Sequence, residues 1–249
     1  MTMAKTACLV GVSAIPVGRH QSPLDAETHV LEHEILARLV VQAVEQAGIT
    51  KQDVQSLILC QCRPYTLQKY FCTFIAHYLH LPSSATVMEV LGNGCTGGIA
   101  LEQAIRDVES GRARAALALG VNFETATSSA EHMNSSMRAT GDVDFHTPYG
   151  LTPISWYAMD AMRYMHEFQV TREILASVAV KNRSHASMNP LAQYRKPITL
   201  EEVLAQRPIV EPLGLYEVSP RSDGAACLVV ASEDLAKASG LPYVRIRGR

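Results

Sequence analysis

A cysteine lies inside a glycine-rich turn, and this is the position in the sequence where we expect covalent chemistry. The turn, residues 91–98, reads LGNGCTGG and places Cys95 between a strand-like and a helix-like segment. The small neighbours Gly94, Thr96, Gly97 and Gly98 leave the sulfur uncovered, and the start of the following helix would aim N–H groups and a positive dipole end at it. We therefore predict that Cys95 is a nucleophile near neutral pH.

Other interpretations of this turn remain open from the sequence. Residues 92–97 match the G-x-G-x-x-G pattern of dinucleotide-binding turns, although Glu124 follows later than that pattern expects. The nucleophile elbow of α/β-hydrolases requires glycine at the position that Asn93 occupies. The glycines could also serve only to pack a helix closely on a sheet, with Cys95 as a small buried filler.

Strands and helices alternate around the turn. The hydrophobic patterns predict strands at 6–15, 56–59, 85–91, 115–121, 224–231 and 244–246, and helices at 28–47, 66–79, 99–110 and 232–239. Such alternation predicts an α/β fold with a mixed, mostly parallel sheet and helices on both faces. Cys95 follows the carboxyl end of a strand, where open α/β sheets bind ligands.

A long insertion interrupts this alternation at residues 122–222. It contains no strand of comparable quality and is predicted to be mainly helical, with helices at 153–168 and 171–185 and a capping box opening a short third at Thr199. We therefore predict one α/β domain, residues 1–121 and 223–240, interrupted by a lid or substrate-binding subdomain over the thiol. An insertion that only stabilises the fold, without binding substrate, is an equal alternative.

Composition excludes several classes of function. The chain is 47% apolar and 18% charged, with a formal net charge of −2 and no basic stripe, so nucleic acid and anionic membranes are not expected partners. Six cysteines are too few for a disulfide scaffold, and they predict a reduced, cytoplasmic protein. Cys60 and Cys62 lack metal-ligand spacing and are predicted to be strand-end core, with no metal bound. No segment approaches the length of a membrane span.

Four motifs in order resemble the thiolase superfamily, and within it the branch of sterol-carrier-protein and archaeal acetoacetyl-CoA thiolases. The motifs are Gly94-Cys95-Thr96-Gly97-Gly98, residues 117–120 (LALG) with Glu124, residues 181–185 (KNRSH) with Asn189-Pro190 and Tyr194, and residues 222–226 (SDGAA). The similarity covers nearly the whole chain. It implies a thiolase-like N-terminal half that transfers an acyl group from acyl-CoA through a thioester on Cys95, without a covalently bound cofactor.

The resemblance also implies what must accompany this chain. Cys95, with the turn residues around it, would contribute a backbone N–H to an oxyanion hole, and a homodimer would form near the strand at 85–91. Family members have two similar α/β halves, and the second supplies the general base. Residues 241–249 would be the first strand of that half, so we expect a C-terminal half or an accessory subunit as partner.

Side chains in the insertion could contribute to substrate binding. His185 lies in a family-like motif, and Met133 could line an acyl tunnel, whereas Met159, Met162 and Met165 are predicted to be helix core. Two functional alternatives to acyl transfer remain: a non-catalytic acyl-CoA-binding or scaffolding subunit, and a thiolase-like aldolase. A dinucleotide-binding domain is a further alternative.

Overall fold

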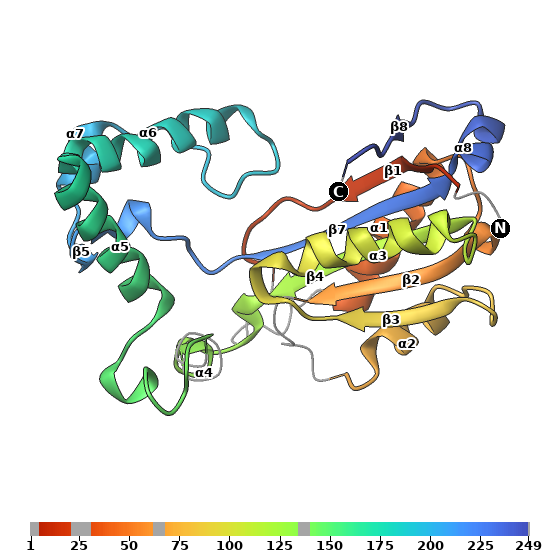
Figure 1. Ribbon diagram of the computed structural model, residues 1–249, viewed down its shortest axis with the longest axis horizontal. Helices are drawn as coiled ribbons and strands as arrows, with labels where there is room; N and C mark the ends of the chain where they lie inside the picture. Colours follow the sequence, from red (N-terminus) through yellow and green to blue (C-terminus); the bar gives the residue numbers. More distant parts are fainter. Residues whose placement is uncertain (1–4, 21–30, 62–67, 134–139, 249) are drawn as a thin grey trace. The chain divides into compact units, whose positions relative to one another are not determined.

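The computed structural model describes residues 5–20, 31–61, 68–133 and 140–248, which form two compact units. We call Met1–Ala126 with Asp223–Arg249 the sheet unit and Thr127–Ser222 the insert unit (Figure 1). The insert unit leaves the sheet unit after one strand and returns at the start of another. Each unit is described by itself below.

The sheet unit contains one six-stranded mixed sheet, in the order β3-β2-β4-β7-β1-β8. Its strands are β1 (Ala7–Ala14), β2 (Val54–Gln61), β3 (Thr86–Val90), β4 (Ala115–Phe123), β7 (Asp223–Ser232) and β8 (Val244–Arg245). Strand β2 pairs in parallel with β3 and β4, whereas β4–β7, β7–β1 and β1–β8 are antiparallel. Because the chain re-enters at Asp223, opposite Phe123 at the end of β4, β7 must run back along β4. The predicted mixed α/β fold is confirmed.

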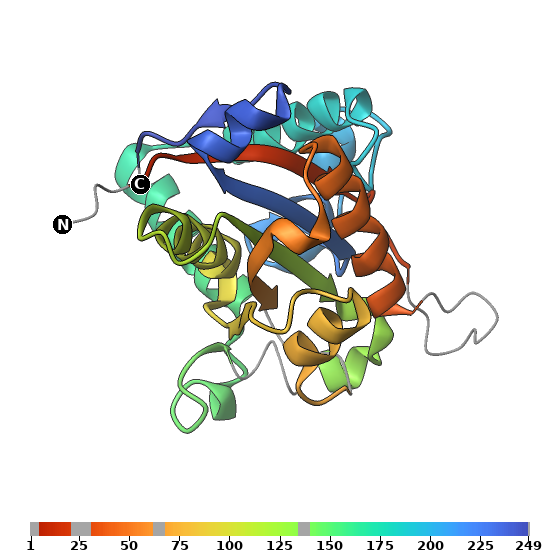
Figure 2. The ribbon, with the colours of Figure 1, turned by 90° about the vertical axis from the view of Figure 1, so that its right-hand side faces the viewer.

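Helices cover both faces of this sheet (Figure 2). One face carries the larger core cluster, to which apolar residues of α1 (Glu32–Gln46), α2 (Phe71–Tyr78) and α8 (Glu233–Ser239) contribute. The other face carries a smaller cluster, to which α3 (Thr96–Glu109) contributes. Helix α1 buries residues at the spacing of one helical face, from Ile35 to Val44. It approaches β1 so closely that a Cβ at Gly11 would lie 2.1 Å from the Ala43 carbonyl oxygen.

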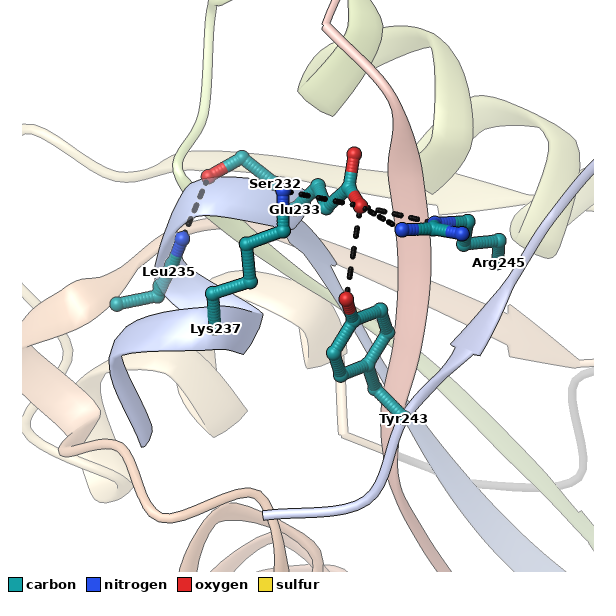
Figure 3. Close-up of polar contacts among 6 residues, drawn as sticks. All are labelled: Ser232, Glu233, Leu235, Lys237, Tyr243 and Arg245. Atoms are coloured by element: carbon teal, nitrogen blue, oxygen red, sulfur yellow. Dashed lines mark hydrogen bonds and ion pairs between the residues drawn. The ribbon is translucent and has the colours of Figure 1, made fainter. Parts of the chain in front are cut away.

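An ionic cluster ties the last strand to the sheet unit (Figure 3). Glu233, in the first turn of α8, accepts hydrogen bonds from Arg245 Nε at 2.8 Å and Nη2 at 2.6 Å, and it pairs with Lys237 Nζ at 3.2 Å. The Arg245 guanidinium is the largest cause that lowers the pKa of Glu233 below its ordinary value. Strand β8 is thereby held on β1 at the edge of the sheet.

The insert unit is mainly helical, but it also contains a small hairpin that the sequence analysis missed. Its helices are α4 (Ser129–His132), α5 (Pro153–Phe168), α6 (Arg172–Met188) and α7 (Leu200–Leu204), and β5 (Pro208–Val210) pairs with β6 (Leu213–Gly214). Strands of three and two residues are too short to produce an alternating pattern. The predicted capping box is confirmed, because Glu202 N donates to Thr199 Oγ1 and Thr199 N to Glu202 Oε2.

Candidate functional site

The cysteine turn joins β3 to α3 through one turn of 3₁₀ helix, Asn93–Cys95. Asn93 adopts φ 48°, the left-handed conformation that asparagine tolerates better than most residues. The buried hydroxyl of Thr96 accepts from Gly92 N at 2.9 Å and donates to the Asn93 carbonyl at 2.6 Å. Helix α3 begins at Thr96, three residues before the prediction, so Cys95 is its N-cap residue.

The turn exposes the thiol, as predicted. Cys95 is exposed, and a Cβ added to Gly94, Gly97 or Gly98 would meet no atom within 4 Å. These three glycines have no positive φ and support no close helix packing among the described residues. The alternative that glycine serves only tight packing, with Cys95 as buried filler, is therefore wrong for this turn. Within the described residues, this face of the turn is open around the three glycines.

The backbone donors of the turn differ from the expectation. The N–H of Cys95 donates to the Gly92 carbonyl at 3.0 Å, and the N–H of Thr96 donates to the Asn93 carbonyl. The 3₁₀ turn continues the helical hydrogen-bond pattern backward, so it uses donors that an abrupt helix start would leave unpaired. In this conformation the Cys95 N–H is engaged within the turn.

The other described cysteines contrast with Cys95. Cys8, Cys60, Cys72 and Cys227 are all buried, and Cys62 lies outside the described residues. Burial raises the pKa of Cys72 to about 11 and that of Cys227 to about 12. Because the thiolate is the reactive form, these two thiols are unreactive near neutral pH. Cys95 is the exposed thiol of the described chain.

The candidate residues of the insertion belong to the insert unit and are described within that unit. His185 is exposed on α6, and Met133 is 40% exposed just after α4. Met159 and Met162 are each 54% exposed, so their prediction as helix core is wrong, whereas Met165 is half-buried. The helical spacing was read correctly, but α5 buries only Ala158 within the described insert unit.

Two polar groups were missed as structural centres by the sequence analysis. Asp223 is fully buried and accepts hydrogen bonds from His20 N at 2.7 Å, from Thr125 N at 2.8 Å and from Thr125 Oγ1. Arg183 lies over the rings of Tyr194 and Tyr216, 4.5 Å and 5.4 Å from their centroids. The SDGAA motif pointed to Asp223 but not to its partners. The motif that contains Arg183 and Tyr194 gave no sign that the two side chains touch.

No three or more His, Cys, Asp or Glu side chains in the described ranges group as metal ligands. Within those same ranges, none of the helices has the length and apolar character needed to cross a membrane.

Comparison with known proteins identifies relatives over most of the chain. The family model for the thiolase N-terminal domain matches residues 8–234. The acetyl-CoA acetyltransferase of Methanocaldococcus jannaschii is 36% identical over 201 residues, which cover 79% of this chain and 50% of that protein. Sterol carrier protein 2 of Gallus gallus is 30% identical over 236 residues, 91% of this chain and 42% of that protein. The chain thus spans about half the length of these curated relatives.

A solved structure shares the fold. The Ltp2-ChsH2(DUF35) aldolase aligns with a TM-score of 0.73 and 30% sequence identity, over 95% of this chain and 58% of that chain. The similarity therefore extends through both units, although it leaves a large part of the neighbour unmatched.

Proposed function

The chain belongs to the thiolase family, and on that premise we propose that it carries the nucleophilic thiol of an acyl-CoA acyltransferase. The observation that carries this proposal is the exposed Cys95 at the N-cap of α3, with open space at Gly94, Gly97 and Gly98. The thiolase family uses CoA thioester substrates. A buried or crowded thiol in this position would not support the proposal.

The proposed reaction has two balanced steps. Cys95 loses its thiol proton to a base, and its sulfur attacks the thioester carbonyl of an acyl-CoA. The bond between the acyl carbon and the CoA sulfur breaks, and the CoA thiolate takes up a proton. In the second step, the thiolate of CoA or the α-carbanion of another acyl-CoA, each formed by loss of a proton to a base, attacks the carbonyl of the Cys95 thioester. The bond between the acyl carbon and the Cys95 sulfur breaks, and the sulfur takes up a proton.

We propose that a second α/β half supplies the base and covers the face of the sheet that carries α3. Residues of β1 and β7 on that face are uncovered: Val12 is 47% exposed, and Ala14 and Ala226 are also exposed. Ile99, one turn after Cys95 on α3, is 42% exposed. Exposed apolar groups of this kind beside a candidate site favour burial against another folded element.

Two assembly proposals follow for the sheet unit. Strand β3 is an edge strand with Val87 and Glu89 exposed, which suits pairing with a second copy in a homodimer. An accessory subunit is supported by the Ltp2-ChsH2(DUF35) aldolase, whose name pairs Ltp2 with a DUF35 component. We further propose that the insert unit, with His185 and Met133, contributes to the acyl-CoA site, and that the protein acts in the cytoplasm.

The direct test is intact mass spectrometry after incubating the full-length protein with an acyl-CoA. We expect a mass gain equal to one acyl group on Cys95, release of CoA, and no gain in Cys95→Ala. Cys72 and Cys227 act as internal controls, because their raised pKa keeps them protonated at pH 8. Absence of an adduct in the complete assembly, or equal turnover by Cys95→Ala, would replace this proposal with a non-catalytic acyl-CoA-binding role.

A second candidate function is carbon–carbon bond cleavage by an aldolase. It is favoured by the Ltp2-ChsH2(DUF35) aldolase, which is 30% identical and covers 95% of this chain. In that reaction a β-hydroxyacyl-CoA loses its hydroxyl proton, the bond between its α- and β-carbons breaks, and the α-carbon takes up a proton. Products are a carbonyl compound and a shorter acyl-CoA. No free CoA is consumed, so measuring CoA uptake separates this reaction from thiolytic acyl transfer.

A further inference from the structure

We propose that Thr96 is a positioning residue for Cys95. Its buried hydroxyl fixes the conformation of the cysteine turn, and this conformation sets the direction from which the sulfur meets a thioester. The role in acyl transfer rests on the proposed function. The hold on the turn rests on contacts within the sheet unit alone.

The hydroxyl of Thr96 bridges two main-chain groups that precede Cys95. It accepts from Gly92 N at 2.9 Å and donates to the Asn93 carbonyl at 2.6 Å. A hydroxyl is both a donor and an acceptor, so one side chain pairs an N–H and a C=O at the same time. A methyl group in its place can do neither. The residue type at position 96 therefore decides whether both main-chain groups keep these partners.

The main chain alone holds the turn with few bonds. The N–H of Cys95 donates to the Gly92 carbonyl at 3.0 Å, and the N–H of Thr96 donates to the Asn93 carbonyl. These are the bonds of a 3₁₀ turn, whose hydrogen-bond geometry is poorer than that of an α-helix. Asn93 has φ 48°, a left-handed conformation that persists where the surrounding structure imposes it. The Thr96 hydroxyl supplies two further bonds to the same short segment.

Thr96 is itself fixed by the core of the sheet unit. Thr96, Ala100 and Ala104 are 1%, 0% and 0% exposed and follow one another at four-residue spacing on α3. This spacing places the three residues on one face of the helix. Ala100 and Ala104 belong to the smaller core cluster, so this is the face that packs on the sheet. The hydroxyl is thus carried by a residue whose place is set by packing, and it ties the turn to that place.

A second contact brings the turn and α3 together. A Cβ at Gly92 would lie 2.3 Å from Ile99 Cδ1, so Ile99 lies directly against this glycine. Apolar contact of this kind has no direction. Packing therefore brings Gly92 close to α3, whereas the hydrogen bond to Thr96 orients its peptide group.

The position of the sulfur depends on this arrangement. Cys95 lies inside the segment that the hydroxyl closes, with φ −94° and ψ 0°. Attack on a thioester carbonyl requires aligned reacting atoms, and a misplacement of about 1 Å can lower a rate about a hundredfold. A small alkylating reagent can approach an exposed thiol from many directions. Loss of the hydroxyl should therefore affect acyl transfer far more than alkylation.

The test compares these two reactions of Cys95 in the full-length protein. Thr96→Val removes the hydroxyl, whereas Thr96→Ser keeps it. We expect Thr96→Val to take an acetyl group from acetyl-CoA at least about tenfold more slowly, while its alkylation by iodoacetamide changes less than about twofold. Thr96→Ser should recover acylation. The matched control is Thr50→Val, which removes a hydroxyl that donates to Asp53 Oδ2 at 2.8 Å before β2, and it should change neither rate.

Folding of the variants is checked on the same samples. Cys72 and Cys227 are buried, so peptide mapping should find both unmodified by iodoacetamide. Equal acylation by the wild type and Thr96→Val would overturn the role of Thr96, as would a Thr96→Ser that is as slow as Thr96→Val. An equal fall in acylation and alkylation would also overturn positioning, because it would mean a general loss of thiol reactivity.

Failure of the proposed function gives a different result. A wild-type protein that takes no acetyl group would contradict acyl transfer itself. Hydrogen exchange of the N–H groups of Gly92 and Cys95 tests Thr96 without that reaction. We expect faster exchange in Thr96→Val and recovery in Thr96→Ser, and unchanged exchange in Thr96→Val would overturn the hold of the hydroxyl on the turn.

Discussion

The two units differ in what holds them together. In the described sheet unit, 37 buried apolar residues form two clusters, 27 on one face of the sheet and 10 on the other. The described insert unit has one cluster of three, Ala176, Ala179 and Val203. Large apolar side chains remain on its surface, including Tyr157 at 67%, Phe168 at 66% and Met188 at 74% exposure.

This difference suggests that the sheet unit provides stability and that the insert unit provides surface for recognition. Burial of apolar surface is the dominant favourable term in folding, so the sheet unit can be stable through its own core. The insert unit relies more on individual polar contacts, such as the Arg172–Glu217 pair and the Thr199 capping box. Its exposed aromatic and methionine side chains are of the kinds enriched at interfaces and binding surfaces. Function in this chain is thus expected where packing is incomplete.

The largest effect on stability is expected from Asp223, the residue at which the chain returns to the sheet unit. Asp223→Ala removes the carboxylate that accepts hydrogen bonds from His20 N, Thr125 N and Thr125 Oγ1. Leaving several buried donors unpaired should lower the free energy of unfolding of the sheet unit by about 4 kcal/mol. Chemical denaturation measures the loss, with Asp144→Ala as an exposed control. A change below about 1 kcal/mol would show that water replaces the carboxylate.

The next prediction compares one core residue from each unit. Leu117→Ala, at 0% exposure on β4, should cost about 3 kcal/mol, because it leaves a cavity in the larger cluster. Val203→Ala, at 1% exposure, should cost about 1.5 kcal/mol, and only in the insert unit. Hydrogen exchange followed by mass spectrometry reports each unit separately. Equal loss of protection in both units from either variant would mean that they unfold as one body.

The sequence predicted the sheet unit better than the insert unit for the same physical reason. Long apolar segments repeat with the period of their element, so β1, β4, β7 and α1 were identified, and the glycine turn identified Cys95. The start of α3 was placed late because Gly97 and Gly98 are poor helix formers, although the helix begins before them, at Thr96. Exposed Met159 and Met162 follow a helical spacing without being core.

Contacts between distant residues could not be predicted from local pattern. Asp223 binds residues 98 and 203 positions away, and nothing in the SDGAA motif specifies them. The ring of Tyr194 reaches Arg183 only because the chain reverses after α6. Hairpin β5–β6 is too short to show a period. Such features depend on the assembled fold, so a single sequence carries little signal for them.

The cysteine turn is the part of the sheet unit that resembles the insert unit, since its surface is also uncovered. Gly97→Ala should stabilise the chain by about 0.5 kcal/mol, because alanine is the better helix former and its Cβ meets nothing within 4 Å. Acyl transfer to Cys95 should nevertheless fall at least tenfold if substrate approaches over this open face of the turn, which the methyl group would narrow. Gly11→Ala, with 2.1 Å to a carbonyl oxygen, is the contrasting variant and should destabilise. Unchanged transfer by a stable Gly97→Ala would show that the glycine serves no substrate.

The smallest effect on stability is expected on α5, and it is the sharpest test of the comparison. Tyr157, Tyr164 and Phe168 fall on one face of the helix, exposed by 67%, 48% and 66%, and the rings of Tyr164 and Phe168 lie 5.1 Å apart. Because little of Phe168 is buried, Phe168→Ser should change the free energy of unfolding by less than about 0.5 kcal/mol. Denaturation of the full-length protein over a range of protein concentrations measures this change and any dependence on association. A loss above about 1.5 kcal/mol would mean that this face is covered in the native protein, and the insert unit would then owe its stability to a contact rather than to its own core.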